Sequence, residues 1–131
     1  MDSDILLDVL LKRQPFMLPA KNVLALADKK NDFLLVTSAI AFVNVHYFLN
    51  KYDRTNKFQL LNIVRSNVSI VNVDEKIIDM ALKNGNDDFE DTVQYFAAMK
   101  AGADVIITRN KKDYIQSEIP VLNAEEFLNT L

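Results

Sequence analysis

The sequence predicts a single α/β domain over residues 1–131, with a mainly parallel sheet covered by helices on both faces. Short apolar or β-branched runs alternate along the chain with stretches in which apolar residues recur every third or fourth position; the runs are 33–37, 68–73, 104–108 and 119–122. This alternation is typical of parallel sheets with crossover helices. No internal repeat or linker interrupts it, and 131 residues are enough to bury one core.

Local signals justify each helix in turn. Ser38 and Asp74 are expected N-caps, and Asn123 with Glu126 has the spacing of a capping box. Gly85 and Gly102 each close a helical pattern, where a left-handed residue is favoured. The expected helices cover about residues 5–12, 19–29, 39–51, 54–66, 74–85, 88–101 and a last segment that opens at 123.

The start of the chain departs from this pattern. Asp2 is the second residue, so the strand that should precede and support it is truncated or missing. Either the first strand is vestigial, or the numbered chain begins at an internal methionine of a longer product. We favour the second interpretation.

Composition limits the chemistry. The chain has no cysteine and one histidine, His46, so a metal must be held by oxygen ligands, which favours Mg²⁺ or Mn²⁺. No apolar run is long enough to cross a bilayer and no signal peptide is recognisable, so we expect a cytoplasmic protein. The net charge of −3 argues against a surface that coats nucleic acid, but a bound cation can still present positive charge to phosphate.

Acidic and amide side chains gather where predicted strands end or helices begin. They form three groups, namely Asp2, Asp4 and Asp8; Asp87, Asp88, Glu90 and Asp91; and Asn110 with Asp113, the last flanked by Arg109, Lys111 and Lys112. If the strands are neighbours, the carboxylates converge, which is unfavourable unless a cation is bound. Such a site suits hydrolysis of a phosphodiester, with nearby Arg and Lys holding the nucleic-acid backbone.

The order and wording of these segments resemble PIN-domain proteins, in particular VapC-like toxins. The similar segments are DSDILLDVLLKRQPF (2–16), TSAIAFVNVHYFL (37–49), DFEDTVQY (88–95), IITRNKKDY (106–114) and SEIPVLNAEEFL (117–128). They occur in the family's order and cover nearly the whole chain.

The resemblance implies a parallel five-stranded sheet, a carboxylate pocket for Mg²⁺ or Mn²⁺, and frequent homodimers. Many relatives are toxins that cleave RNA and are silenced by an antitoxin. Carried over by position, Asp2 and Asp91 are metal ligands, with Asp88 as an accessory acid. Asn110 stands at the fourth acidic position and Asn44 where many relatives have glutamate, so two charges are replaced by amides.

We therefore expect a metal-dependent endoribonuclease of toxin–antitoxin type. In it Asp2 and Asp91 hold metal, and Asn44 and Asn110 occupy catalytic positions. Supporting metal contacts are expected from Asp4, Asp88 and Asp113, and RNA contacts from Arg109, Lys111 and Lys112. The alternative is a catalytically weakened PIN domain that binds protein or RNA. A phosphate-accepting signalling receiver is a third interpretation. The sequence argues against it, because a receiver needs a lysine after its last strand and none directly follows Val121-Leu122.

Overall fold

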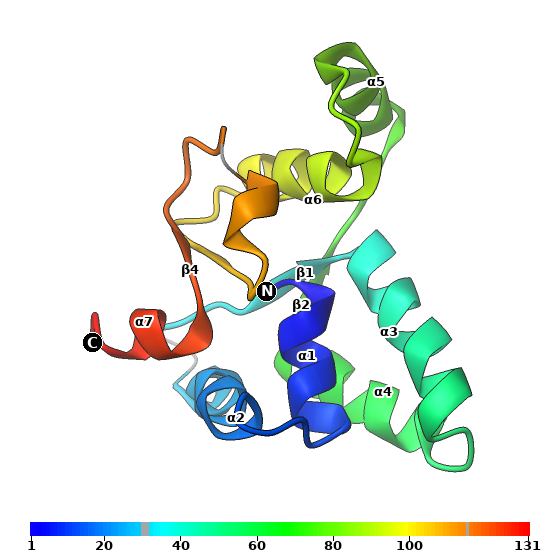
Figure 1. Cartoon of the computed structure of the whole chain (residues 1–131), viewed down its shortest axis with the longest axis vertical. Helices are drawn as coiled ribbons and strands as arrows, with labels where there is room; N and C mark the ends of the chain where they lie inside the picture. Colours follow the sequence, from blue (N-terminus) through cyan, green and yellow to red (C-terminus); the bar gives the residue numbers. More distant parts are fainter. Residues whose placement is uncertain (30–31, 115) are drawn as a thin grey trace.

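The computed structural model describes residues 1–29, 32–114 and 116–131, and it has the predicted α/β character (Figure 1). The α-helices are α1 (Ser3–Leu10), α2 (Met17–Ala25), α3 (Ala39–Tyr52), α4 (Lys57–Asn67), α5 (Glu75–Asn84), α6 (Phe89–Lys100) and α7 (Ala124–Leu128). The strands are β1 (Val36–Ser38), β2 (Ser69–Val71), β3 (Ile106–Ile107) and β4 (Val121–Leu122). Two 3₁₀ helices, η1 (Leu26–Asp28) and η2 (Lys111–Tyr114), complete the described elements.

The strands pair in parallel, as the alternating pattern predicts. In the first pair β1 lies beside β2, with Val36 opposite Ser69. In the second pair β3 lies beside β4, with Ile106 opposite Val121. Within the described ranges these are two separate two-stranded sheets, so the expected continuous sheet of five strands is not confirmed.

Met1 and Asp2 lie between the two strand pairs and connect them. The amino group of Met1 donates to the carbonyl of Val36 at 2.7 Å, and the Thr37 hydroxyl donates back to the carbonyl of Met1 at 2.8 Å. On the other side the Asp2 N–H donates to the carbonyl of Ile107 at 2.9 Å. Met1 and Asp2 therefore link β1 to β3 at the position where a first strand was expected.

Helices cover both faces of the strands. The two residues of β3 show this division, because Ile107 packs with Ile5 and Val23 whereas Ile106 packs with Tyr114. The largest buried cluster joins α1, α2, α3 and α4 and contains Leu6, Leu7, Leu10, Leu24, Leu35, Val45, Leu49, Leu61, Val64 and Val68. No helix in the described part of the chain is long and apolar enough to cross a membrane.

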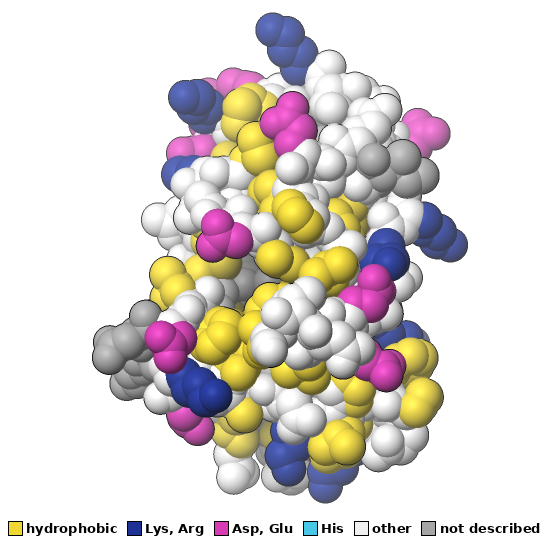
Figure 2. Space-filling view, turned by 90° about the vertical axis from the view of Figure 1, so that its left-hand side faces the viewer, with side chains coloured by type: hydrophobic (Ala, Val, Ile, Leu, Met, Phe, Trp, Pro, Cys, Tyr) yellow, Lys and Arg dark blue, Asp and Glu magenta, His cyan; other side chains and the backbone are white. Residues whose placement is uncertain are grey.

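Apolar surface stays open beside the junction of the strand pairs. Figure 2 shows hydrophobic side chains gathered across the middle of the face that carries β4 and α7. A hollow of about 310 Å³ is lined by Met1, residues 32–36 and 101–105, Ile107 and Phe127. Leu34, at its edge, is 78 % exposed, so the predicted strand over 33–37 is wrong in its first half, and the observed strand begins only at Val36.

Local signals predicted the helix caps correctly. The side chains of Ser38, Asp74 and Asn123 each accept a backbone N–H at the start of a helix, and the capping box at Asn123 and Glu126 is complete. Gly85 has the expected left-handed conformation, with φ of 72°.

Other boundaries differ from the predictions. The first helix begins at Ser3 because Asp2 caps it, and α4 begins at Lys57 rather than near residue 54. The helix η2, over Lys111–Tyr114, was not predicted.

Truncation of Leu49 to alanine should destabilise the fold strongly, because its side chain is fully buried in the largest cluster. We expect Leu49→Ala to lower the free energy of unfolding by about 2–5 kcal/mol, from lost burial and the cavity left behind. Urea denaturation followed by circular dichroism measures this. Leu82→Ala is the matched control, because Leu82 is also helical but 63 % exposed. It should change stability by less than about 0.5 kcal/mol, and equal losses in the two variants would contradict this account of the core.

Candidate metal-binding cleft

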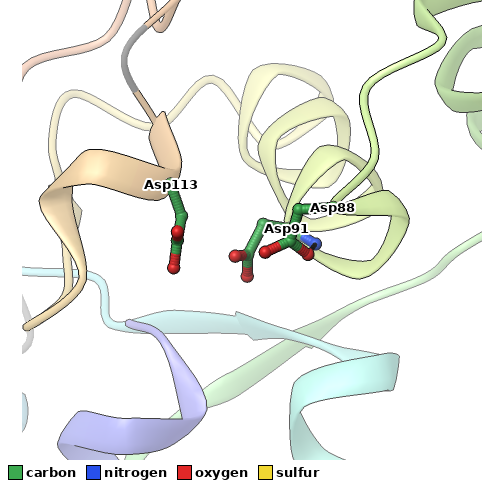
Figure 3. A group of neighbouring side chains, drawn as sticks. All are labelled: Asp88, Asp91 and Asp113. Carbon is green, nitrogen blue, oxygen red and sulfur yellow. Dashed lines mark hydrogen bonds between the residues drawn. The ribbon is translucent and has the colours of Figure 1, made fainter.

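Three aspartates from two elements converge at one point. Asp88 and Asp91 stand at the start of α6, and Asp113 belongs to η2. One carboxylate oxygen from each lies within 4.8 Å of the other two. Figure 3 shows the three side chains directed toward one another across the space between the start of α6 and η2. Carboxylates this close repel one another unless a proton or a cation lies among them.

The start of α6 fixes two of these side chains. Asp88 is the N-cap residue, and its Oδ1 accepts from the Asp91 N–H at 3.2 Å. The Thr92 hydroxyl donates to the Asp88 carbonyl at 2.8 Å, so the cap is bonded at both its side chain and its backbone. Because a helix start also favours negative charge, local structure holds both acids where they meet Asp113.

The three aspartates line a cleft of about 360 Å³. Its wall also includes Tyr95, Lys112 and Tyr114. The cleft therefore combines acidic groups at its centre with one basic side chain, which is an arrangement that can accept a cation together with an anionic ligand.

Asp2 lies behind this cleft and is held by hydroxyl groups. Its side chain is buried, and its Oδ2 accepts from the Thr108 hydroxyl at 2.9 Å and from the Tyr114 hydroxyl at 3.2 Å. Tyr114 also lines the cleft, so one side chain both donates to Asp2 and borders the cleft of the three clustered aspartates. Neutral hydroxyl donors orient the Asp2 carboxylate without cancelling its charge.

Asp4 presents one bonded and one free oxygen. Its Oδ2 accepts from the Arg109 N–H at 3.0 Å and lies 3.4 Å from Nδ2 of Asn110. Its Oδ1 is buried and has no hydrogen-bond partner among the described residues. A buried carboxylate oxygen without a donor is unfavourable, and a bound cation is one partner that would satisfy it.

Burial and mutual repulsion change the proton affinity of the acids. Burial, a hydrogen bond with Asp88 and the charges of Asp2, Asp88 and Asp113 raise the pKa of Asp91 to about 9. Burial and the charge of Asp2 raise the pKa of Asp4 to about 6. At neutral pH Asp91 therefore holds a proton that a cation would displace. All these donors are carboxylate oxygens, so their chemistry fits a hard divalent cation.

The two asparagines at expected catalytic positions each contact an acid from another element. Nδ2 of Asn44, on α3, donates to Oε1 of Glu90, on α6, at 2.7 Å. Nδ2 of Asn110 faces Asp4, as described above.

The three basic residues expected to bind RNA have different surroundings. The Arg109 side chain forms two hydrogen bonds with Asp8, and Lys111 forms an exposed ion pair with Glu126 at 2.9 Å. Lys112 lines the cleft. Of the three, Lys112 is therefore the one placed beside the acidic centre.

Two site residues were not singled out from the sequence, namely Thr108 and Tyr114. Both lie in the segment IITRNKKDY, and Thr108 stands at the end of a predicted strand, which was the available signal. Their role depends on contact with Asp2, more than 100 residues away in sequence, as the separations of 106 and 112 residues show.

The parallel strands, the covering helices and the carboxylate cleft define an α/β domain with a candidate metal site at the carboxyl edge of its strands. Residues 1–112 match the family described as PIN domain, so the chain belongs to the PIN domain family. It is 34 % identical over 105 residues to Ribonuclease VapC1 of Aquifex aeolicus (strain VF5), an alignment that covers 74 % of this chain and 70 % of that protein. The predicted resemblance to VapC-like PIN-domain proteins is confirmed.

Without metal, the protein should become less stable as the pH rises from about 4 to about 9. Folding raises the pKa of Asp91 from 3.8 to about 9, so across this interval the folded state keeps a proton that the unfolded state has lost. The contribution of Asp91 to stability is thus complete below about pH 4 and is lost as the pH rises through about 9. Urea denaturation in EDTA at several pH values measures it.

Two substitutions separate this effect from general charge repulsion. Asp91→Asn should flatten the pH dependence because the amide does not titrate. Asp87→Asn, at an exposed neighbour outside the cluster, should leave it unchanged. A slope that is the same in both variants would show that Asp91 is not its source.

Proposed function

We propose that this protein is a divalent-metal-dependent endoribonuclease of toxin–antitoxin type. The observation that carries the proposal is the convergence of Asp88, Asp91 and Asp113 to within 4.8 Å in an open cleft. Membership of the PIN family and similarity to a protein named Ribonuclease VapC1 support RNA as the substrate. The metal is Mg²⁺ or Mn²⁺, because the donors are oxygens and the chain has no cysteine.

In this proposal each acid has a role that depends on its position in the site. Asp91, Asp88 and Asp113 hold the cation, and Asp2 adds negative charge from behind Tyr114. Asp4 contributes its free Oδ1 from the start of α1. When bound, a divalent ion lowers the pKa of a coordinated water and stabilises charge on the phosphate and the leaving oxygen.

The asparagines complete the site without adding charge. An amide oxygen can ligate a hard cation or accept from a water molecule, and an amide N–H₂ can orient a carboxylate. We assign these tasks to Asn110 and Asn44, whose amide nitrogens face Asp4 and Glu90 respectively.

RNA is held near the metal by cationic side chains at the cleft. Lys112 is the first candidate because it lines the wall. Lys111 can join it, because an exposed ion pair such as that with Glu126 contributes little and exchanges readily. These contacts reach phosphate rather than base edges, so the cleft residues give affinity without sequence recognition.

An antitoxin protein and a second copy of the chain are the proposed partners. This part of the proposal rests on the similarity to Ribonuclease VapC1. Exposed apolar side chains on α3, including Val43 and Tyr47, are available for such contacts.

Asp91→Asn should abolish metal-dependent cleavage of RNA. The variant removes a charged ligand from the centre of the cluster, and we expect a loss of at least about 100-fold in rate, equivalent to about 2.7 kcal/mol of transition-state stabilisation. Cleavage of a labelled RNA in Mg²⁺, Mn²⁺ or EDTA measures this, and titration calorimetry measures Mn²⁺ affinity in parallel. Asp87→Asn is the matched control and should keep both properties.

Each outcome of this assay selects between the candidate functions. Undiminished cleavage by Asp91→Asn would refute the assigned site. Absence of turnover together with absence of tight Mn²⁺ binding would favour the alternative, a weakened PIN domain that binds protein or RNA, whereas tight Mn²⁺ binding would weigh against it. The observation that favours this alternative is the pair of asparagines, Asn44 and Asn110, at positions where a carboxylate was expected.

A further inference from the structure

Asp8 and Arg109 form a partly buried ion pair, and both residues line a second hollow rather than the acidic cleft. The Asp8 side chain is fully buried. Its Oδ2 accepts from Nε of Arg109 at 2.8 Å and its Oδ1 accepts from Nη2 at 2.9 Å, so the contact is bidentate. Arg13 lies 3.9 Å from the same carboxylate, and the Arg109 guanidinium lies 4.0 Å from the centre of the Phe16 ring. The arginine is therefore held by charge, by two hydrogen bonds and by stacking.

The backbone of Arg109 is bound to a second acid on the same helix. Its N–H donates to Oδ2 of Asp4, which precedes Asp8 by one turn of α1. The adjacent Thr108 hydroxyl donates to Asp2. Residues 108–110 are thus bonded to α1 at two points, through the side chain and the backbone N–H of Arg109. The same residues carry the Thr108 hydroxyl and the Arg109 N–H, which donate to Asp2 and Asp4.

Such a pair is better explained by geometry than by stability. Removing two charges from water offsets most of their attraction, and well-packed apolar residues often stabilise a protein as well as a buried ion pair does. The planar fork of an arginine fixes both distance and orientation at a carboxylate, which a lysine cannot reproduce. The pair of Asp8 and Arg109 therefore holds residues 108–110 in one defined position relative to α1.

We propose that Arg109 is a positioning residue for the acidic cleft, acting through its clamp on Asp8, and is not a contact to RNA phosphate. The inference rests on the proposed function, in which the cleft binds a divalent cation. It assigns to Asp8 and Arg109 the orientation of Asp2 and Asp4 toward that cation. It also gives a reason for the bidentate contact of Arg109 with a fully buried acid.

Asp8→Asn distinguishes the two roles of Arg109. If Arg109 positions the site, the variant weakens Mn²⁺ binding by about 10-fold or more, as loss of an outer partner of a metal ligand does. It also lowers kcat for RNA while KM stays within about 2-fold, because substrate contacts are untouched. If Arg109 instead binds phosphate, Asp8→Asn frees the guanidinium, so KM falls and Mn²⁺ affinity is unchanged. That second result would overturn the proposal.

Arg109→Lys and a matched control complete the series. Arg109→Lys keeps the charge but loses the fork, so it should reproduce the Asp8→Asn defect in Mn²⁺ affinity. Asp74→Asn removes a carboxylate from another ion pair, that with Lys100, and leaves a good N-cap residue. It should keep wild-type Mn²⁺ affinity. Normal affinity in Arg109→Lys would contradict the clamp.

An apolar pair separates positioning from folding. The double variant Asp8→Leu with Arg109→Met replaces the ion pair by side chains that can fill the same buried space, so its Tm should equal or exceed that of the wild type. The proposal requires its Mn²⁺ affinity still to fall by about 10-fold or more. A stable double variant with wild-type affinity would refute the proposal.

A metal-independent measurement keeps the clamp testable if the wild type binds no Mn²⁺. Amide hydrogen exchange of Arg109 and Asn110 in the metal-free protein reports how firmly residues 108–110 are held. We expect Asp8→Asn to accelerate it by about 10-fold or more, because local opening governs exchange, and Asp74→Asn to leave it unchanged. Equal exchange in the wild type and Asp8→Asn would refute the clamp, whereas failure of Mn²⁺ binding alone would refute the proposed function.

Discussion

The hydrogen bonds of Met1 and Asp2 are the constraint on which the rest of the molecule depends. They connect the strand pair of β1 and β2 to that of β3 and β4, and in the part of the chain that the structure describes the two pairs share no strand-to-strand hydrogen bonds of their own. Because the backbone of Asp2 is bonded to Ile107, its carboxylate is carried to the carboxyl edge of β3 and lies against Thr108. The same bonds that connect the strand pairs therefore also place the buried carboxylate of Asp2.

The charge of Asp2 affects the proton affinity of the acids around it. Its charge contributes to the raised pKa of Asp91, Asp4 and Glu90, after burial in each case. The groups that touch its Oδ2 are the hydroxyls of Thr108 and Tyr114, which orient it and leave its charge intact. The guanidinium of Arg109, the residue after Thr108, forms its ion pair with Asp8. Among the described residues no Lys or Arg side chain forms an ion pair with Asp2, so its carboxylate is hydrogen-bonded but not paired with a cation.

Sequence reasoning succeeded where structure is decided locally and failed where it is decided by contacts between distant segments. The caps at Ser38, Asp74 and Asn123 were predictable because each bond spans three residues. Asp88 and Asp91 were expected at the start of a helix, and their metal-binding role was taken from the resemblance to PIN-domain proteins. The length of β1 and the presence of η2 depend on contacts with distant segments, which a local sequence pattern does not predict. The pairing of Asp8 with Arg109 joins positions 101 residues apart, so one sequence without relatives cannot reveal it.

The two asparagines change the meaning of the missing carboxylates once their neighbours are considered. The amide of Asn44 donates to Glu90 at 2.7 Å, and that of Asn110 faces Asp4 at 3.4 Å. In each place a carboxylate from another element contacts the amide. An amide beside a carboxylate donates a hydrogen bond where a second carboxylate would repel. The two amides therefore form hydrogen bonds with Glu90 and Asp4 where a second carboxylate would add repulsion, so the acidic oxygens of these two residues are retained.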